Sequence, residues 1–256
     1  MHLRVLGAHN MESKDTRMEC HLIDGVLALD AGSLARALSF EEQRGVRAVL
    51  LSHRHFDHLR DLLPLGITLW NTGLTVDVYG IKDTIEHVTD RLMDGKLYPD
   101  FLNLPSLANP VFRLHAVELL REFSVLDYIV MAVPVPHAVP AVGFQISNSG
   151  SRLFYTGDAG QGLADAWEHV DPEVLLTEVT FGNDDEERAL LVGHLTPRFL
   201  EEALTAFRDR RGYLPKVIVT HLNPPWEAEI RRELQPIASK LGVEIIVSWA
   251  DMEVEV

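Results

Sequence analysis

Four side chains that can bind metal ions lie within six positions of one another, in the stretch His53-Arg-His-Phe-Asp-His58. The imidazoles of His53 and His55 can reach one metal ion from a tight loop, whereas the adjacent pair Asp57 and His58 points the other way and can start a second site. Imidazole and carboxylate ligands suit zinc, manganese or iron. Two such ions about 3.5–4 Å apart form a clamp suited to phosphate-ester hydrolysis. The stretch therefore predicts a metal site rather than a solvated polar loop.

The residues on either side predict the elements that position this stretch. Val46 to Leu51 is a continuous apolar run, which is typical of a buried strand, and Leu59, Leu62 and Leu63 follow the stretch at helical spacing. Asp30 ends another apolar segment, Leu27-Ala-Leu, just before a glycine. We expect Asp30 to accept a hydrogen bond from a metal-bound histidine and so to fix the orientation of that ring.

The segment before the metal-binding stretch predicts strands, a loop and one helix. We expect a strand over residues 1–6, and two short strands within 20–29 joined by the turn dipeptide Asp24-Gly25. A helix is expected over residues 33–44, with Ser33 as its N-cap and Gly45 at its end. Residues 8–19 predict a polar loop near the site, and we expect His9 to lie at the rim of the site rather than to bind metal.

In the second half of the chain, each of four expected apolar strands is followed by a histidine or a carboxylate side chain. The expected strands and the residues that follow them are 128–135 with His137, 152–156 with Asp158, 174–177 with Glu178, and 216–220 with His221. Layered α/β proteins build sites from distant sequence in this way, because strand ends meet at one edge of a sheet. A lone histidine after a strand is ordinarily a hydrogen-bonded loop residue, but four such strand ends favour one shared site.

The middle of the chain carries the weakest signals. Residues 82–93 predict a helix, and Pro99, Pro105 and Pro110 interrupt any long element in 94–126. We expect an insertion at about 82–127 that covers the site as a lid or supports a homodimer. Four basic and six acidic side chains leave residues 90–127 with a net charge of −2. The insertion is therefore not a cationic arm.

Length and charge limit the class of protein. With 256 residues and 46% hydrophobic residues, residues 1–256 are expected to form one domain with a sizeable core. No apolar stretch is long enough for a membrane span, and Cys20 is the only cysteine, so we expect a cytoplasmic protein without a membrane partner. The net charge of −15 argues against tight binding of long nucleic acid.

These motifs together resemble the metallo-β-lactamase superfamily, across nearly the whole chain. The resemblance implies an α/β fold, the αββα four-layer sandwich, with a dinuclear metal site. Three histidines would hold one metal, three residues the other, and one aspartate would bridge them: His53, His55 and His137; Asp57, His58 and His221; and Asp158. True lactamases usually carry a cysteine at the position of Asp158, so the aspartate speaks against antibiotic hydrolysis.

Two further motifs resemble the phosphodiesterase branch of that superfamily, which contains ribonuclease Z and class II cyclic-nucleotide phosphodiesterases. They are Thr177-Glu-Val-Thr-Phe181 and Gly193-His-Leu-Thr196. The resemblance implies that His194 assists the reaction and that Glu178 orients it. From the chemistry, we expect Asp57 to act both as a metal ligand and as a proton acceptor. The alternative for His194 is a structural place before the helix expected at 197–208, which Thr196 would cap.

Short matches at residues 30–33 and 97–101 look like the class II cyclic-nucleotide enzymes. We therefore expect a phosphodiesterase with two divalent metals, zinc first and manganese or iron as alternatives. Its substrate would be a small phosphodiester such as a 3′,5′-cyclic nucleotide, attacked by a metal-bridging hydroxide. Three alternatives stay open: a ribonuclease Z-like tRNA endonuclease, a thioester or lactone hydrolase, and a non-catalytic metal-binding protein of the same fold.

Overall fold

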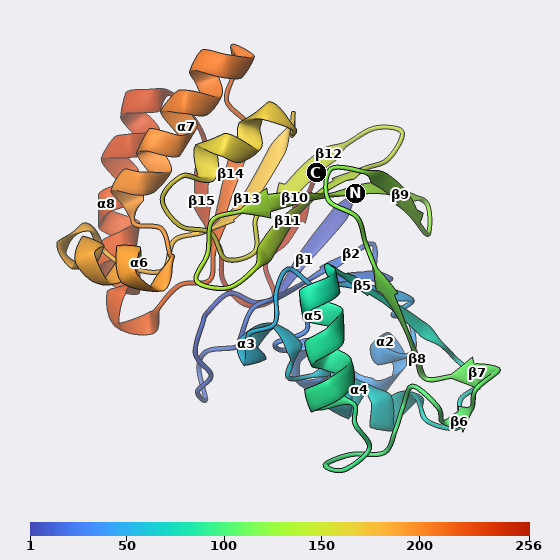
Figure 1. The fold of residues 1–256 in the computed structure, drawn as a ribbon. Helices are drawn as coiled ribbons and strands as arrows, with labels where there is room; N and C mark the ends of the chain where they lie inside the picture. Colours follow the sequence, from blue (N-terminus) through green and yellow to red (C-terminus); the bar gives the residue numbers. More distant parts are fainter.

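Two seven-stranded β-sheets pack face to face in the computed structural model, which describes residues 1–256 (Figure 1). The first sheet has the order β16 (Glu253–Glu255), β1 (His2–Gly7), β2 (Cys20–Ile23), β3 (Leu27–Leu29), β4 (Ala48–Leu50), β5 (Val76–Gly80), β8 (Phe112–Ala116). The second has the order β15 (Ile245–Val247), β14 (Lys216–Thr220), β13 (Val174–Glu178), β12 (Arg152–Tyr155), β11 (Ala141–Ser147), β10 (Tyr128–Val135), β9 (Glu122–Val125). A separate hairpin joins β6 (Pro105–Ser106) to β7 (Asn109–Pro110).

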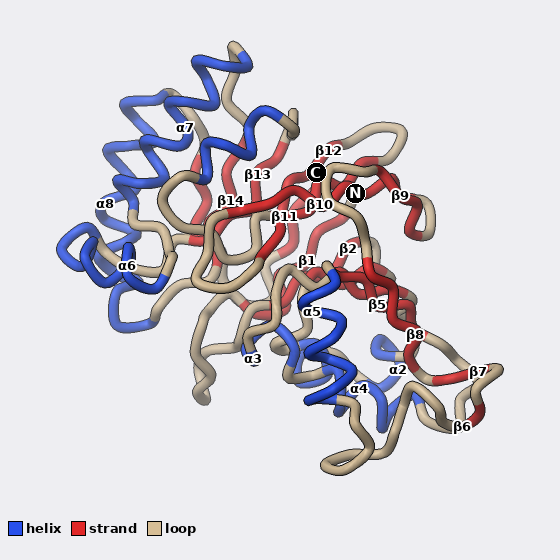
Figure 2. Tube along the Cα trace, viewed as in Figure 1, coloured by secondary structure: helices blue, strands red, loops and turns tan.

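Helices cover the outer face of each sheet (Figure 2). On the first sheet they are α1 (Leu34–Ala37), α2 (Phe40–Gln43), α3 (Phe56–Leu59), α4 (Leu62–Leu69), and α5 (Lys82–His87), which continues into a π-helical turn (Val88–Leu92). On the second sheet they are α6 (Glu186–Val192), α7 (Pro197–Arg211) and α8 (Glu227–Leu241), with 3₁₀ turns at Leu163–Glu168, Asn183–Asp185 and Pro224–Trp226. The arrangement confirms the predicted αββα sandwich.

Three apolar layers hold the sandwich together. The central layer lies between the sheets, where Leu29 and Leu50 of the first sheet belong to the same buried cluster as Phe144 and Leu176 of the second. The outer layers lie beneath the helices, one around Leu62 of α4 and the other around Trp167, Phe207 and their neighbours. Removal of this apolar surface from water is the main driving force that brings the two halves of the chain together.

The reactive side chains lie at one end of the sandwich because of strand direction. In the first sheet β3, β4, β5 and β8 run parallel, and in the second β12, β13, β14 and β15 do so. Since β10 and β12 are both antiparallel to the strand between them, β10 also ends on this side. The chain therefore leaves β4, β10, β12 and β14 close to the residues predicted to bind metal.

Several predicted boundaries were wrong. The single helix expected over 33–44 is two short helices, because Leu38 is extended (ψ 140°) and the Ser39 hydroxyl caps α2 by accepting from the backbone N–H of Glu42. Ser33 makes no side-chain cap. Helix α7 does begin after Thr196, whose hydroxyl accepts from the N–H of Phe199. Helix α8 includes Pro236 and ends at Leu241.

The proline-interrupted middle segment is in part a component of the core. The side chain of Phe101 is fully buried and contacts Trp70 and Phe112 edge to face, with ring centroids 6.2 and 6.1 Å apart. Gly66 of α4 makes room for it, since a Cβ atom there would lie 2.5 Å from the Phe101 ring. A lid function for this segment stays a prediction.

None of the helices combines the length and the hydrophobicity that crossing a membrane requires. The two chain ends lie together: the amino group of Met1 donates a hydrogen bond to the carbonyl oxygen of Val256, 3.1 Å away (Figure 1). Strand β16 pairs with β1 at the edge of the first sheet.

Replacing Phe101 with alanine should lower the free energy of unfolding by about 3–5 kcal/mol, because it leaves a cavity between α4 and β8. Chemical denaturation measures this loss. The matched control is Leu97→Ala, whose side chain in the same segment is 77% exposed, and it should change stability by less than about 0.5 kcal/mol. Equal stability of the two variants would contradict the packing described for this segment.

Candidate metal centre

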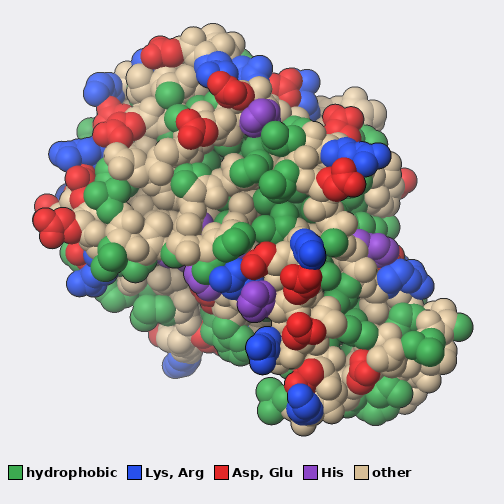
Figure 3. Space-filling model, in the orientation of Figure 1, with side chains coloured by type: hydrophobic (Ala, Val, Ile, Leu, Met, Phe, Trp, Pro, Cys, Tyr) green, Lys and Arg blue, Asp and Glu red, His purple; other side chains and the backbone are tan.

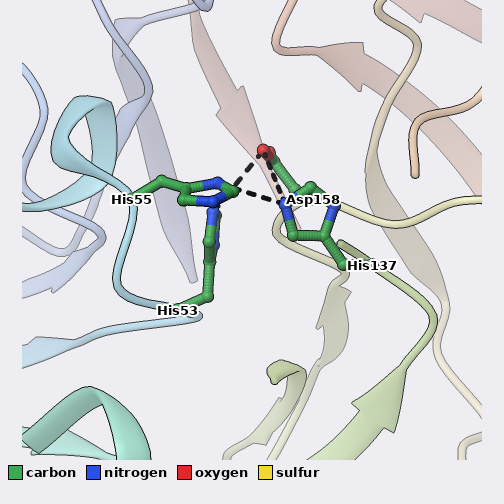
Figure 4. Close-up of side chains that lie close together, drawn as sticks. All are labelled: His53, His55, His137 and Asp158. Carbon is green, nitrogen blue, oxygen red and sulfur yellow. Dashed lines mark hydrogen bonds and ion pairs between the residues drawn. The ribbon is translucent and has the colours of Figure 1, made fainter. Parts of the chain in front are cut away.

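Three histidine rings converge on one point at the end of the sandwich (Figure 4). His53 and His55 come from the loop after β4, and His137 comes from the loop after β10. One ligand atom from each lies within 4.8 Å of the others and of a carboxylate oxygen of Asp158. His137 Nε2 and His55 Nδ1 are 3.2 Å apart. We call His53, His55 and His137 the three-histidine cluster; three imidazoles that face one point are a donor set typical of zinc sites.

A second group of ligand atoms lies beside the first and consists of Asp57, His58 and His221. His221 Nε2 lies 3.3 Å from Asp57 Oδ2, and His58 Nε2 lies 3.7 Å from the same oxygen. Asp57 and His58 are on α3, whereas His221 follows β14 on the opposite sheet. We call these three residues the second cluster.

Asp158 lies between the two clusters and directs one oxygen to each. Its Oδ1 is 3.2 Å from Nε2 of both His58 and His221. Its Oδ2 is 3.7 Å from His53 Nε2 and 3.8 Å from His137 Nε2. The side chain is 2% exposed, so water does not compensate its charge. This position is the one that a bridging ligand would occupy.

The rings are oriented by hydrogen bonds to their other nitrogen atoms. The Nδ1 atoms have oxygen partners as follows: His53 with Ser52 Oγ at 3.0 Å, His58 with Asp30 Oδ2 at 2.7 Å, His137 with the Gly193 carbonyl at 2.8 Å, and His221 with Thr180 Oγ1 at 3.0 Å. These contacts at Nδ1 leave Nε2 as the ring atom that faces the centre and can bind a metal ion. The predicted contact between Asp30 and a candidate ligand is confirmed.

Divalent cations fit this donor set. His53 Nε2, His58 Nε2 and Asp158 Oδ1 are buried and lack any hydrogen-bond partner. Burial of a polar atom without a partner costs free energy, so such atoms are rare unless a ligand satisfies them. Here the unpartnered atoms are imidazole nitrogens and a carboxylate oxygen facing one another, which are the atom types that zinc, manganese or iron accept.

The electrostatics of the two clusters differ. Burial, reinforced by the neighbouring His58, lowers the pKa of His53 well below its usual value. Burial also opposes protonation of His221, but the charge of Asp158 and the hydrogen bond to Asp57 outweigh it and raise the pKa of His221 to about 9. The pKa of Asp158 lies well below its usual value: burial would raise it, but His221 and His58 prevail. The neighbouring carboxylates therefore favour a positive charge on His221, whereas burial disfavours one on His53.

His194 and Glu178 form a hydrogen-bonded pair beside the two clusters. His194 Nδ1 is 2.6 Å from Glu178 Oε1, and the His194 ring stacks on the His221 ring with centroids 5.3 Å apart. The carboxylate of Glu178 is fully buried and also accepts from the backbone N–H groups of Ala159 and Leu195. The His194 side chain stays 13% exposed, so its edge can meet a substrate.

One predicted position was wrong, and one carboxylate was not foreseen. His9 is not at the rim: it is 6% exposed, and its Nε2 lies 3.1 Å from Glu227. The missed carboxylate is Glu19, which is buried behind His221. Tyr155 was not singled out either, yet its hydroxyl donates to Asp30 Oδ2 at 2.6 Å. Glu19 is the last residue of the expected polar loop and Tyr155 lies within an expected strand, and nothing in the local sequence distinguishes them.

Comparison with known proteins gives the family. The 3′,5′-cyclic-nucleotide phosphodiesterase of Aliivibrio fischeri is 23% identical over 230 residues, covering 72% of this chain and 67% of the relative. The ribonuclease Z of Thermococcus sibiricus is 26% identical over 110 residues, and the match spans 42% of this chain and only 32% of that protein. The crystal structure of unliganded yeast PDE1 is similar with a TM-score of 0.83 at 15% identity, covering 100% of this chain and 99% of that chain. The family model described as beta-lactamase superfamily domain matches residues 21–222, so this chain belongs to the β-lactamase superfamily.

Proposed function

We propose that the protein is a dinuclear metal-dependent phosphodiesterase that hydrolyses a small phosphodiester such as a 3′,5′-cyclic nucleotide. The observation that carries this proposal is the Glu178–His194 pair beside Asp158, with the pair's Nδ1–Oε1 distance at 2.6 Å. A purely structural metal site has no need of an oriented, partly exposed imidazole at its edge. The same pair argues against the thioester or lactone hydrolases and the non-catalytic metal-binding proteins of this fold.

The metal ligands we propose are the three-histidine cluster for one ion, the second cluster for the other, and Asp158 for both. Two divalent cations, with zinc as the first candidate, would neutralise phosphoryl charge and lower the pKa of water. The Nδ1 partners hold the histidine rings in place, and Asp158 would offer one carboxylate oxygen to each ion. Asp57 is the most exposed carboxylate of the set, at 25%, and is the proposed proton acceptor.

His194 is the proposed proton donor. Its Nδ1–H donates to Glu178, so the proton on Nε2 can pass to the leaving alkoxide oxygen. Burial disfavours the charged ring, but Glu178 outweighs burial and raises the pKa of His194 above its ordinary value of 6.5. Glu178 therefore favours the protonated ring that can donate to the leaving group. Glu178 acts through His194, with Thr180 donating to its second oxygen at 2.7 Å.

A small substrate is favoured over a long nucleic acid by charge. The net charge is −15, and on the face shown in Figure 3 acidic and basic side chains alternate without a broad basic patch. Tight binding of polynucleotides depends on neutralising several phosphates at once. Among the relatives, the cyclic-nucleotide phosphodiesterase matches 72% of this chain, whereas the ribonuclease Z matches 42%. Because of the similarity to ribonuclease Z, processing of the tRNA 3′ end is the second candidate function.

Turnover on a panel of substrates tests the proposal. The purified, zinc-loaded protein should hydrolyse bis-p-nitrophenyl phosphate and 3′,5′-cyclic AMP and leave a precursor tRNA uncut. Removal of the tRNA 3′ trailer would instead assign the ribonuclease Z activity. Two bound metals without activity on any phosphodiester would contradict the proposal and direct the search to thioesters and lactones. Manganese- and iron-loaded samples, run in parallel, identify the preferred metal.

Replacing His194 with alanine should lower kcat on bis-p-nitrophenyl phosphate about 10²–10⁴-fold while the bound metal stays unchanged. Elemental analysis of each purified variant measures the metal. In contrast, Asp158→Ala should lose metal and activity together, because both clusters lose their shared partner. His115→Ala serves as the control, since His115 pairs with Asp77 at 2.7 Å outside the site, and it should keep both. Full activity of His194→Ala would refute the assigned role.

The pH dependence follows from the raised pKa of His194. The protonated ring is the active form, so kcat should fall as the pH rises through its folded-state pKa, above 6.5. Glu178→Gln removes the charge that raises this pKa and should move the alkaline limb of the kcat profile to lower pH. Glu227→Gln, which removes a carboxylate that pairs with His9 instead, should leave the limb in place. An unchanged limb in Glu178→Gln would show that another group titrates there.

A further inference from the structure

Glu19 is a buried carboxylate that links the start of β2 to the end of β14. It is 1% exposed. Its Oε2 accepts from the backbone N–H of His221 at 3.1 Å and from the hydroxyl of Thr220 at 2.9 Å. Its Oε1 lies 2.5 Å from His21 Nε2 and 3.5 Å from the Tyr155 hydroxyl. Glu19 touches no metal ligand through a side chain; it holds the backbone of one.

The backbone of His221 needs such an anchor. His221 has a φ of +54°, in the left-handed region that favours glycine. A non-glycine residue is strained in this conformation and persists there only where its surroundings impose it. The Glu19 carboxylate receives the N–H group of this residue, and the next residue, Leu222, donates to the Ala8 carbonyl at 2.8 Å. This backbone conformation directs the imidazole so that Nε2 lies 3.2 Å from Asp158 Oδ1.

The other candidate ligands depend on other partners. His53 is oriented by Ser52, His137 by the Gly193 carbonyl and His58 by Asp30. None of these contacts includes Glu19. We infer that Glu19 is a positioning residue: by holding the backbone of His221 it sets the metal affinity of the second cluster and leaves that of the three-histidine cluster unchanged. The inference rests on the proposed dinuclear centre but not on the proposed substrate.

Two substitutions of Glu19 distinguish an effect of its position from an effect of its negative charge. Glu19→Gln removes the charge, but its carbonyl oxygen can still accept from His221 and Thr220 while its amide donates to His21 Nε2. Glu19→Asp keeps the charge, but the side chain is shorter by one carbon–carbon bond of about 1.5 Å, so its oxygens cannot reach the His221 N–H. If Glu19 acts by position, glutamine is the conservative replacement and aspartate is the damaging one. If it acts by charge, the order reverses.

The experiment is a zinc titration of the metal-depleted protein against a chromophoric chelator, which resolves the two binding steps. Wild type should bind two zinc ions, and Glu19→Gln should bind both within about threefold of wild type. Glu19→Asp should bind the second zinc about 10–100-fold more weakly and the first as wild type does. Cobalt absorption spectra of the same proteins should show the loss confined to one of two metal environments.

Asp24→Asn is the matched control. Asp24 also accepts from a backbone N–H, that of His2, and from a tyrosine hydroxyl, that of Tyr128, but at the opposite end of β2. It should leave both zinc affinities unchanged. If Glu19→Asp does not fold, Glu19→Met takes its place, because methionine keeps the volume and removes both oxygens.

Three results would overturn the inference. In the first, Glu19→Asp, or Glu19→Met in its place, binds both zinc ions as tightly as wild type. In the second, Glu19→Gln weakens zinc binding as much as Glu19→Asp does. In the third, a substitution weakens both zinc-binding steps equally. Wild-type protein that binds fewer than two zinc ions would overturn the dinuclear centre and the inference together. Two zinc ions without turnover of any phosphodiester would contradict only the proposed substrate, and the role of Glu19 would still be decided by the titration.

Discussion

The buried carboxylate of Asp158 is the constraint on which the rest of the site depends. Taking a carboxylate out of water costs several kcal/mol unless opposite charge and hydrogen bonds compensate it. Here the compensation comes from imidazoles on both sides, two at 3.2 Å from one oxygen and two at 3.7 and 3.8 Å from the other. These imidazoles come from both sheets, so the sandwich must bring β4, β10, β12 and β14 to a common end. The charge of Asp158 is therefore compensated only when both sheets contribute to the site.

Buried polar side chains behind the metal-binding histidines connect the two sheets by hydrogen bonds and fix the orientation of the imidazole rings. Tyr155, on β12 of the second sheet, donates to Asp30 at the end of β3, and Asp30 in turn holds His58. Glu19 lies beside the first sheet and accepts a hydrogen bond from the backbone N–H of His221, which follows a strand of the second sheet. Asp30 and His221 both have left-handed backbones, with φ of +55° and +54°. Strain of this kind is stored at functional sites and is balanced by the packing of the surrounding structure.

The sequence was sufficient for the features that depend on local patterns. The cluster at residues 53–58 and the apolar strands ending at Glu178 and Thr220 are continuous in the chain, so their period and spacing can be read directly. Glu19 could not be predicted, because its hydrogen bond to His221 joins residues 202 positions apart. The break between α1 and α2 near Leu38 was not predicted, because serine is a favourable N-cap residue at both position 33 and position 39. Phe101 lies in a segment interrupted by prolines, where the apolar residues have no regular spacing that would predict which side chains are buried. The cytoplasmic location and the homodimer stay predictions.

Anomalous diffraction at the zinc edge, from crystals of the zinc-loaded protein, tests the central claim most directly. The account predicts two peaks, one within the three-histidine cluster and one within the second cluster, with a carboxylate oxygen of Asp158 between them. Their separation should be about 3.5–4 Å. A single peak, or a second peak whose ligands exclude His58 and His221, would contradict the account.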